Sequence, residues 1–218
     1  MDQSIFILAL SAISLGFIHT IIGPDHYLPF VAMAKTRTWS TSRTISVVAI
    51  CGLGHALSSV AIGAIFIFAG FALDKVFFIN ELRGNIASWF LFSVGLVYTI
   101  WAIIHRLKHP NHEHTHLNND NKNKKSMTFW VLFAIFVFGP CEPLIPLLMY
   151  PAANHNLIAL VFISLLFTVT TISTMLAMTL LMLKGASFVK FHALEKYQHV
   201  LAGSTLTLCG ASIIFLGL

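Results

Sequence analysis

The chain has 218 residues, of which 57% are apolar and only 10% are charged, and its mean hydropathy is +0.83. A soluble domain carries about 25% charged residues. This composition therefore excludes a soluble globular protein and predicts a polytopic helical membrane protein. The net charge of +5 comes largely from short segments between apolar runs, which favours contact with lipid headgroups over binding of nucleic acid.

Six apolar segments are long enough to cross the bilayer, since about 30 Å of hydrocarbon takes roughly 20 helical residues. They lie at approximately 4–33, 45–72, 86–104, 128–150, 157–183 and 199–218. We therefore predict an all-α fold with six transmembrane helices. It divides into a first three-helix repeat at 1–104, a His-rich cytoplasmic linker at 105–126 and a second three-helix repeat at 127–218.

Two of these segments are interrupted in the same way. Gly23-Pro24 is followed by Asp25-His26, and 116 residues later Gly139-Pro140 is followed by Cys141-Glu142. Proline removes a backbone donor and glycine lets the chain turn, so both segments are expected to be broken helices. Unpaired backbone groups and charges are costly at membrane depth and are tolerated where they line a cavity. The pattern predicts a polar site between the two breaks.

The basic residues predict the orientation of the chain. Eleven of the thirteen follow the first, third and fifth segments: Lys35, Arg37, Arg43, Arg106, Lys108, Lys122, Lys124, Lys125, Lys184, Lys190 and Lys196. The positive-inside rule places these residues in the cytoplasm and both termini outside, in a multi-pass protein of the plasma (inner) membrane. Because each half then makes three crossings, the two repeats are expected to be inverted, as in many secondary transporters.

The linker contains five histidines within twelve residues: His105, His109, His112, His114 and His116. It has almost no apolar residues with which to fold, so we expect it to be mobile. The composition is typical of a weak metal-capture tract, and the other interpretation is a solvated linker that happens to be rich in histidine.

Candidate metal ligands occur in both halves of the chain. His19, Asp25 and His26 surround the first break and His55 lies in the second segment, within a run of small residues that allows close helix approach. Imidazole binds late transition metals and a carboxylate compensates their charge. The equivalent residues of the second break, Cys141 and Glu142, would complete the site. The sequence leaves open whether Cys141 is a ligand, a redox thiol or a packing residue.

These residues resemble the nickel/cobalt transporter family and related urease-accessory-type membrane proteins, within a lysine-exporter-like superfamily. The mark of that family is a histidine, four residues and then Asp-His. Here five residues separate His19 from Asp25-His26, and Leu53-Gly54-His55 matches a second-helix motif. The resemblance implies a secondary transporter of a divalent cation, nickel or cobalt first, which is not an enzyme and holds no permanent cofactor. Its expected partners are the metal ion and the lipid bilayer, and the resemblance also allows a homo-oligomer or a metallochaperone. No nucleic acid is expected as a partner.

Two other functions fit parts of the pattern. The stretch Gly139-Pro140-Cys141-Glu142-Pro143 is similar to the broken helices of membrane thiol–disulfide relays in cytochrome c maturation. Such relays need a cysteine in each repeat, and Asp25 stands where the first would be, so Cys51 would have to substitute. Export of a small anion or amino acid is the third alternative, although acidic and imidazole groups suit a cation better.

Overall fold

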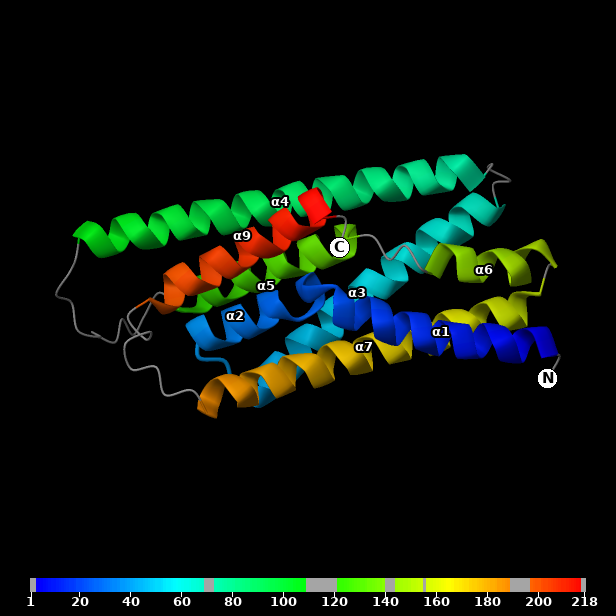
Figure 1. Ribbon diagram of the computed structural model, residues 1–218, viewed down its shortest axis with the longest axis horizontal. Helices are drawn as coiled ribbons and strands as arrows, with labels where there is room; N and C mark the ends of the chain where they lie inside the picture. Colours follow the sequence, from blue (N-terminus) through cyan, green and yellow to red (C-terminus); the bar gives the residue numbers. More distant parts are fainter. Residues whose placement is uncertain are drawn as a thin grey trace.

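The computed structural model describes residues 3–68, 73–108, 121–139, 144–154, 156–188 and 197–216. Its regular elements within these ranges are all helices (Figure 1). They are α1 (Gln3–Ile22), the 3₁₀ helix η1 (Pro24–His26), α2 (Leu28–Thr36), α3 (Thr41–Phe68), α4 (Leu73–Lys108), α5 (Asn121–Phe138), α6 (Leu144–Ala153), α7 (Leu157–Phe188) and α9 (Gln198–Leu216).

Four of the described helices are long and apolar enough to cross a membrane, at Gln3–Ile22, Thr41–Ile62, Glu81–His105 and Leu157–Gly185. Shorter apolar helices cover Phe129–Phe138 and His199–Phe215. Large apolar side chains point outward, including Val97 and Ile158, which are 67% and 85% exposed. A surface of this kind is stable in lipid and not in water. The prediction of an all-α, multi-pass membrane protein is confirmed.

The first predicted break is present, and local hydrogen bonds stabilise it. α1 ends at Ile22, and Pro24 opens the short η1 before the chain resumes as α2. The N–H of Gly23 donates to the carbonyl of His19, and the Tyr27 hydroxyl donates to the carbonyl of Ile21. These bonds satisfy groups that the broken helix would otherwise leave unpaired in the membrane. Of the second break, the structure describes the residues up to Gly139 and from Leu144.

The third helix is longer than its predicted segment. α4 begins at Leu73 and ends at Lys108, whereas the apolar run predicts 86–104. Hydropathy marks only the part that suits hydrocarbon, and a helix satisfies its own backbone on either side of that part. Helical structure also reaches into the predicted linker, since α4 continues past His105 and α5 starts at Asn121. The rest of that linker lies outside the described residues.

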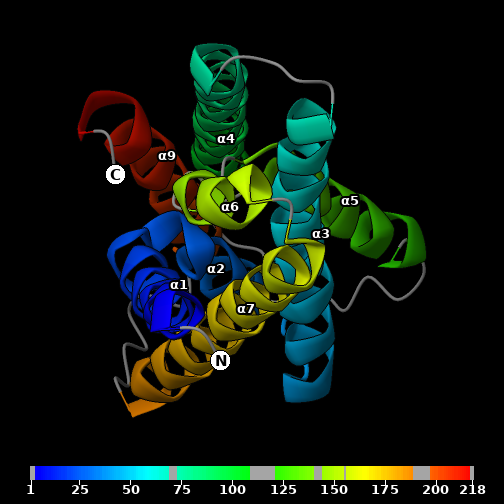
Figure 2. The same cartoon turned by 90° about the vertical axis from the view of Figure 1, so that its right-hand side faces the viewer.

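α4 and α7 lie on opposite sides of the bundle in both views (Figures 1 and 2). α4 packs along α9, where three glycines allow the backbones to approach closely. A Cβ at Gly95 would lie 2.4 Å from the Thr207 nitrogen, and one at Gly210 would lie 2.5 Å from the Phe92 nitrogen. Small residues at a helix contact are the usual means of close packing in membranes. This contact therefore fixes α4 against α9.

Replacing Gly210 by alanine should destabilise the protein by about 1–3 kcal/mol, because the added methyl must push two backbones apart. The measurement is thermal unfolding in detergent. Gly185→Ala is the matched control, since a Cβ there meets no atom within 4 Å. Equal melting temperatures for the two variants would contradict the proposed tightness of the α4–α9 contact.

Candidate functional site: a buried three-histidine cluster

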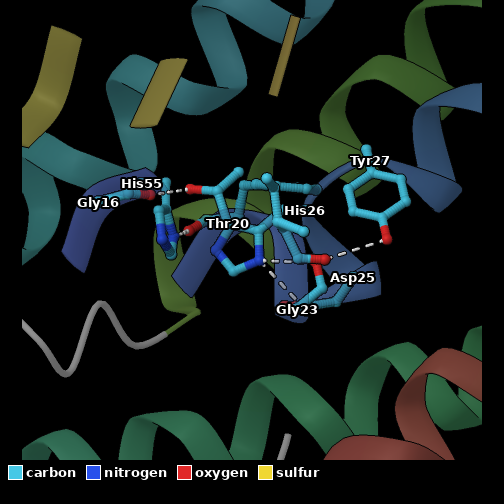
Figure 3. Close-up of polar contacts among 9 residues, drawn as sticks. Gly16, Thr20, Gly23, Asp25, His26, Tyr27 and His55 are labelled. Carbon is cyan, nitrogen blue, oxygen red and sulfur yellow. Dashed lines mark hydrogen bonds and ion pairs between the residues drawn. The ribbon is translucent and has the colours of Figure 1, made fainter. Parts of the chain in front are cut away.

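The first break and α3 bring three histidines together. His19 lies in the last turn of α1. His26 lies in η1 and His55 in α3 (Figure 3). The ring centroids of His19 and His26 are 4.4 Å apart, and those of His26 and His55 are 5.2 Å apart. One ring nitrogen from each residue lies within 4.8 Å of the other two. Metal–nitrogen bonds are about 2.0–2.1 Å long, so two ligand nitrogens on one ion lie at most about 4.2 Å apart. The three nitrogens are therefore close to, but slightly wider than, the spacing of a bound ion.

Hydrogen bonds determine the tautomer of two of these rings. Nδ1 of His55 lies 3.1 Å from the carbonyl oxygen of Phe136, and Nδ1 of His26 lies 3.2 Å from that of Gly23. A carbonyl only accepts, so each Nδ1 carries the hydrogen and donates. In a neutral ring, Nε2 then holds the lone pair. When neutral, both rings have the tautomer that can bind a metal through Nε2.

The Nε2 atoms of His19, His26 and His55 are all buried without a hydrogen-bond partner. Leaving a buried polar atom unpaired costs about 1–3 kcal/mol. Three such atoms in one cluster need a partner, which can be a bound ion or water.

Asp25 supplies the negative charge of the cluster. Its Oδ1 lies 3.2 Å from Nδ1 of His26, and its side chain is 28% exposed (Figure 3). A carboxylate that accepts from Nδ1 orients the imidazole and increases its basicity at the other nitrogen. Gly23 is needed for this arrangement, since a Cβ there would lie 2.6 Å from Nδ1 of His26.

The cluster opens into a cavity of about 410 Å³ between the first break, α3, α4 and the ends of α5 and α9. The polar side chains that line it, besides the histidines, are Asp25, Glu81, Asn85 and Ser88. The last three all come from α4. The wall is otherwise apolar, with Leu91 and Phe136 among its residues.

Two side chains hold the end of α5 at this cavity. A helix leaves its last carbonyls without partners. Here His55 donates to Phe136, and Arg83 Nη2 donates to the carbonyl of Val137 at 2.9 Å and to Ser58 Oγ at 3.1 Å. Gly139, the first residue of the second break, also lines the cavity. The second break therefore begins beside the histidines.

Of the residues that the sequence predicts for a metal site, the structure brings together His19, Asp25, His26 and His55. Cys141 and Glu142 lie outside the described residues, as do His109, His112, His114 and His116. His105 is described, and its ring stacks on Trp101 in the last turns of α4, away from the cavity lining.

Sequence reasoning missed the polar residues of α4. The spacing of Glu81, Asn85 and Ser88 along one helical face is the signal that could have identified them.

The fold and the site define a polytopic helical membrane protein with a polar cavity at a helix break. Residues 28–217 match the family described as the cytochrome c biogenesis protein transmembrane region. The chain belongs to this family. No curated protein and no solved structure matches the chain.

This membership overturns the resemblance to nickel/cobalt transporters and, with it, the predicted transport of a divalent metal. The family match extends over α2 to α9. The motif at the first break, on which the resemblance to nickel/cobalt transporters mainly rested, consists of His19 and Asp25-His26, and these residues precede the matched region. Three ionisable residues at one break are a local feature, whereas the family match covers most of the chain. The alternative of a thiol–disulfide relay fits the family better.

Replacing Arg83 by methionine should lower the stability by about 1–3 kcal/mol, because the Val137 carbonyl loses its donor while the aliphatic stem remains. Arg83→Lys should recover part of the loss, since an ammonium can donate to the same oxygen. Thermal unfolding of the purified protein measures both changes. Identical stabilities for the wild type and Arg83→Met would refute the role of Arg83 at the end of α5.

Proposed function

We propose that the chain is a membrane thiol–disulfide electron relay in which Cys141 and Cys51 form the redox pair. The observation that carries this proposal is the family match, which extends over 28–217 and includes both cysteines. The family description concerns cytochrome c biogenesis. Thiol–disulfide chemistry in that process is the function that we infer for this chain.

The described part of the chain supports the pairing. Cys51 is fully buried one helical turn before His55, in a core cluster that also contains Ile135 and Phe136. Cys141 is five residues beyond Phe136 in the sequence. A chain segment of five residues spans at most about 18 Å, so the length of chain between Phe136 and Cys141 is compatible with the proposed pair. Cys209 belongs to the same buried cluster, and Cys51 and Cys209 are both free thiols.

The proposed reaction transfers two electrons. A thiolate of the reduced pair attacks the disulfide of a partner protein, and a mixed disulfide forms as the partner's first thiolate leaves. The second cysteine then attacks the mixed disulfide, which releases the reduced partner and leaves a Cys51–Cys141 disulfide. A dithiol reductant on the cytoplasmic side reverses these steps and regenerates the pair.

Mild oxidation of the purified protein should therefore protect Cys51 and Cys141 together from alkylation after denaturation. Mass spectrometry of the alkylated peptides measures this protection. Cys141→Ser should make Cys51 fully alkylatable, whereas Cys209→Ser, the matched control, should leave the disulfide intact. The relay is excluded if Cys51 and Cys141 remain alkylatable in the oxidised wild type.

The six-helix inverted repeat also belongs to the proposal. In support of it, α1 packs on α7 as α5 packs on α3, and α2 packs on α7 as α6 packs on α3. These are the pairs that an exchange of two inverted three-helix halves would produce. With the basic residues in the cytoplasm, both termini lie outside the plasma membrane, and α4 begins at the outer side.

A second candidate function is binding of a resident transition-metal ion at His19, His26 and His55. It is favoured by a separate observation, the three buried Nε2 atoms without partners. Three imidazoles with an open fourth position are a ligand set that zinc and copper accept. This proposal concerns binding at a fixed site and involves no passage of the ion across the membrane.

Zinc binding, measured by isothermal titration calorimetry on the full chain in detergent, tests this second function. The four histidines at 109–116 are first changed to serine, so that the linker adds no background. His26→Ala should weaken binding at least about tenfold, since loss of even an outer partner of a ligand costs 10–100-fold. The control is His199→Ala, because His199 is an exposed histidine bonded to Tyr98 on α4 and α9. Equal affinities for the two variants would contradict the site.

A further inference from the structure

We infer that one face of α4, formed by Glu81, Gly84, Asn85 and Ser88, is a hydrophilic, cation-selective access path from the outer end of α4 to the histidine cluster. The inference deepens the metal-binding proposal and rests on it for the identity of the cation. It names the route and the residue that selects the charge.

The spacing of these residues places them on a single face. Positions 81, 84, 85 and 88 recur every three or four residues, which is the repeat of one side of an α-helix. All four line the cavity that also contains His19, His26 and His55. The intervening Ile86 and Trp89 are 57% and 53% exposed and do not line it. α4 therefore has a polar face toward the cavity and an apolar face toward lipid.

The exposure of the polar residues decreases along the helix. Glu81 and Asn85 are exposed, whereas Ser88 is only 2% exposed. The Ser88 hydroxyl donates to the carbonyl of Gly84 at 2.7 Å, so its oxygen remains available as an acceptor. Gly84 itself has no side chain to narrow the route. The series leads from two exposed polar side chains to a buried acceptor in the cavity that also contains the cluster.

The charges along the path favour a cation. Glu81 lies at the mouth and Asp25 at the inner end, and the described lining residues include no lysine or arginine. The guanidinium of Arg83 donates to Ser58 and to the Val137 carbonyl and is not among the lining residues, although its charge acts on His55 and opposes part of this attraction. A cleft lined by one sign of charge attracts ions of the other sign.

The size of the cavity suits a hydrated ion. A water molecule takes about 30 Å³ of liquid volume, so an ion with six waters needs roughly 200 Å³. The cavity holds about 410 Å³. A cation can thus enter with its water and exchange it for imidazole nitrogens at the inner end.

Cysteine accessibility tests the path without any metal. Single cysteines replace Asn85, Ser88 or Ile86 in a chain with Cys51→Ala, Cys141→Ser and Cys209→Ala, reconstituted in vesicles. Membrane-impermeant methanethiosulfonates of either charge are then added outside. Ser88→Cys should react although Ser88 is 2% exposed, and Asn85→Cys should react faster. Ile86→Cys, the lipid-facing control, should react at least tenfold more slowly than Asn85→Cys.

Charge selectivity is the second readout. At low salt the cationic reagent should label Asn85→Cys several-fold faster than the anionic one, and Glu81→Gln should reduce this ratio. An unreactive Ser88→Cys beside a reactive Asn85→Cys would overturn the path, as would equal labelling of Ile86→Cys and Asn85→Cys. A ratio unchanged by Glu81→Gln would overturn the role of Glu81. The labelling involves no metal ion, so it tests the access path independently of the zinc titration, which tests the metal-binding proposal.

Discussion

The structure depends on how backbone groups are satisfied where a helix stops inside a membrane. At the first break, the carbonyls of Gly23 and Ile21 accept from His26 and Tyr27 side chains. At the end of α5, the carbonyls of Phe136 and Val137 accept from His55 and Arg83. In hydrocarbon each unpaired group would cost several kcal/mol. The polar side chains around the cavity therefore stabilise the breaks by hydrogen bonds to the backbone. Only the polar atoms that do not take part in these bonds are available for chemistry.

The histidines illustrate this double role. For His26 and His55, Nδ1 is used to stabilise a break, and Nε2 remains buried without a partner. An outer partner of this kind is the usual means by which a protein orients a metal ligand. In each of these rings, Nδ1 therefore stabilises the backbone and Nε2 faces the candidate site.

The sequence predicted the broken first helix and the meeting of His19, Asp25, His26 and His55, because Gly-Pro and ionisable residues in an apolar run have few stable arrangements. It failed where the signal is not local. The extent of α4 was underestimated, since hydropathy ends before the helix does. The polar face of α4 was overlooked because a single polar residue per turn hardly changes the mean hydropathy of its segment. The family was misassigned because a short ligand-like motif was given more importance than the pattern of the whole chain.

The hydrogen bond between His55 of α3 and Phe136 of α5 joins two residues that are 81 positions apart in the sequence. A positive charge bound at Nε2 withdraws electrons from the imidazole, and a hydrogen bond from a more electron-poor donor is shorter and stronger. The carbonyl that receives this bond lies three residues before Gly139. A cation bound at Nε2 of His55 would therefore strengthen the hydrogen bond by which α3 holds the end of α5.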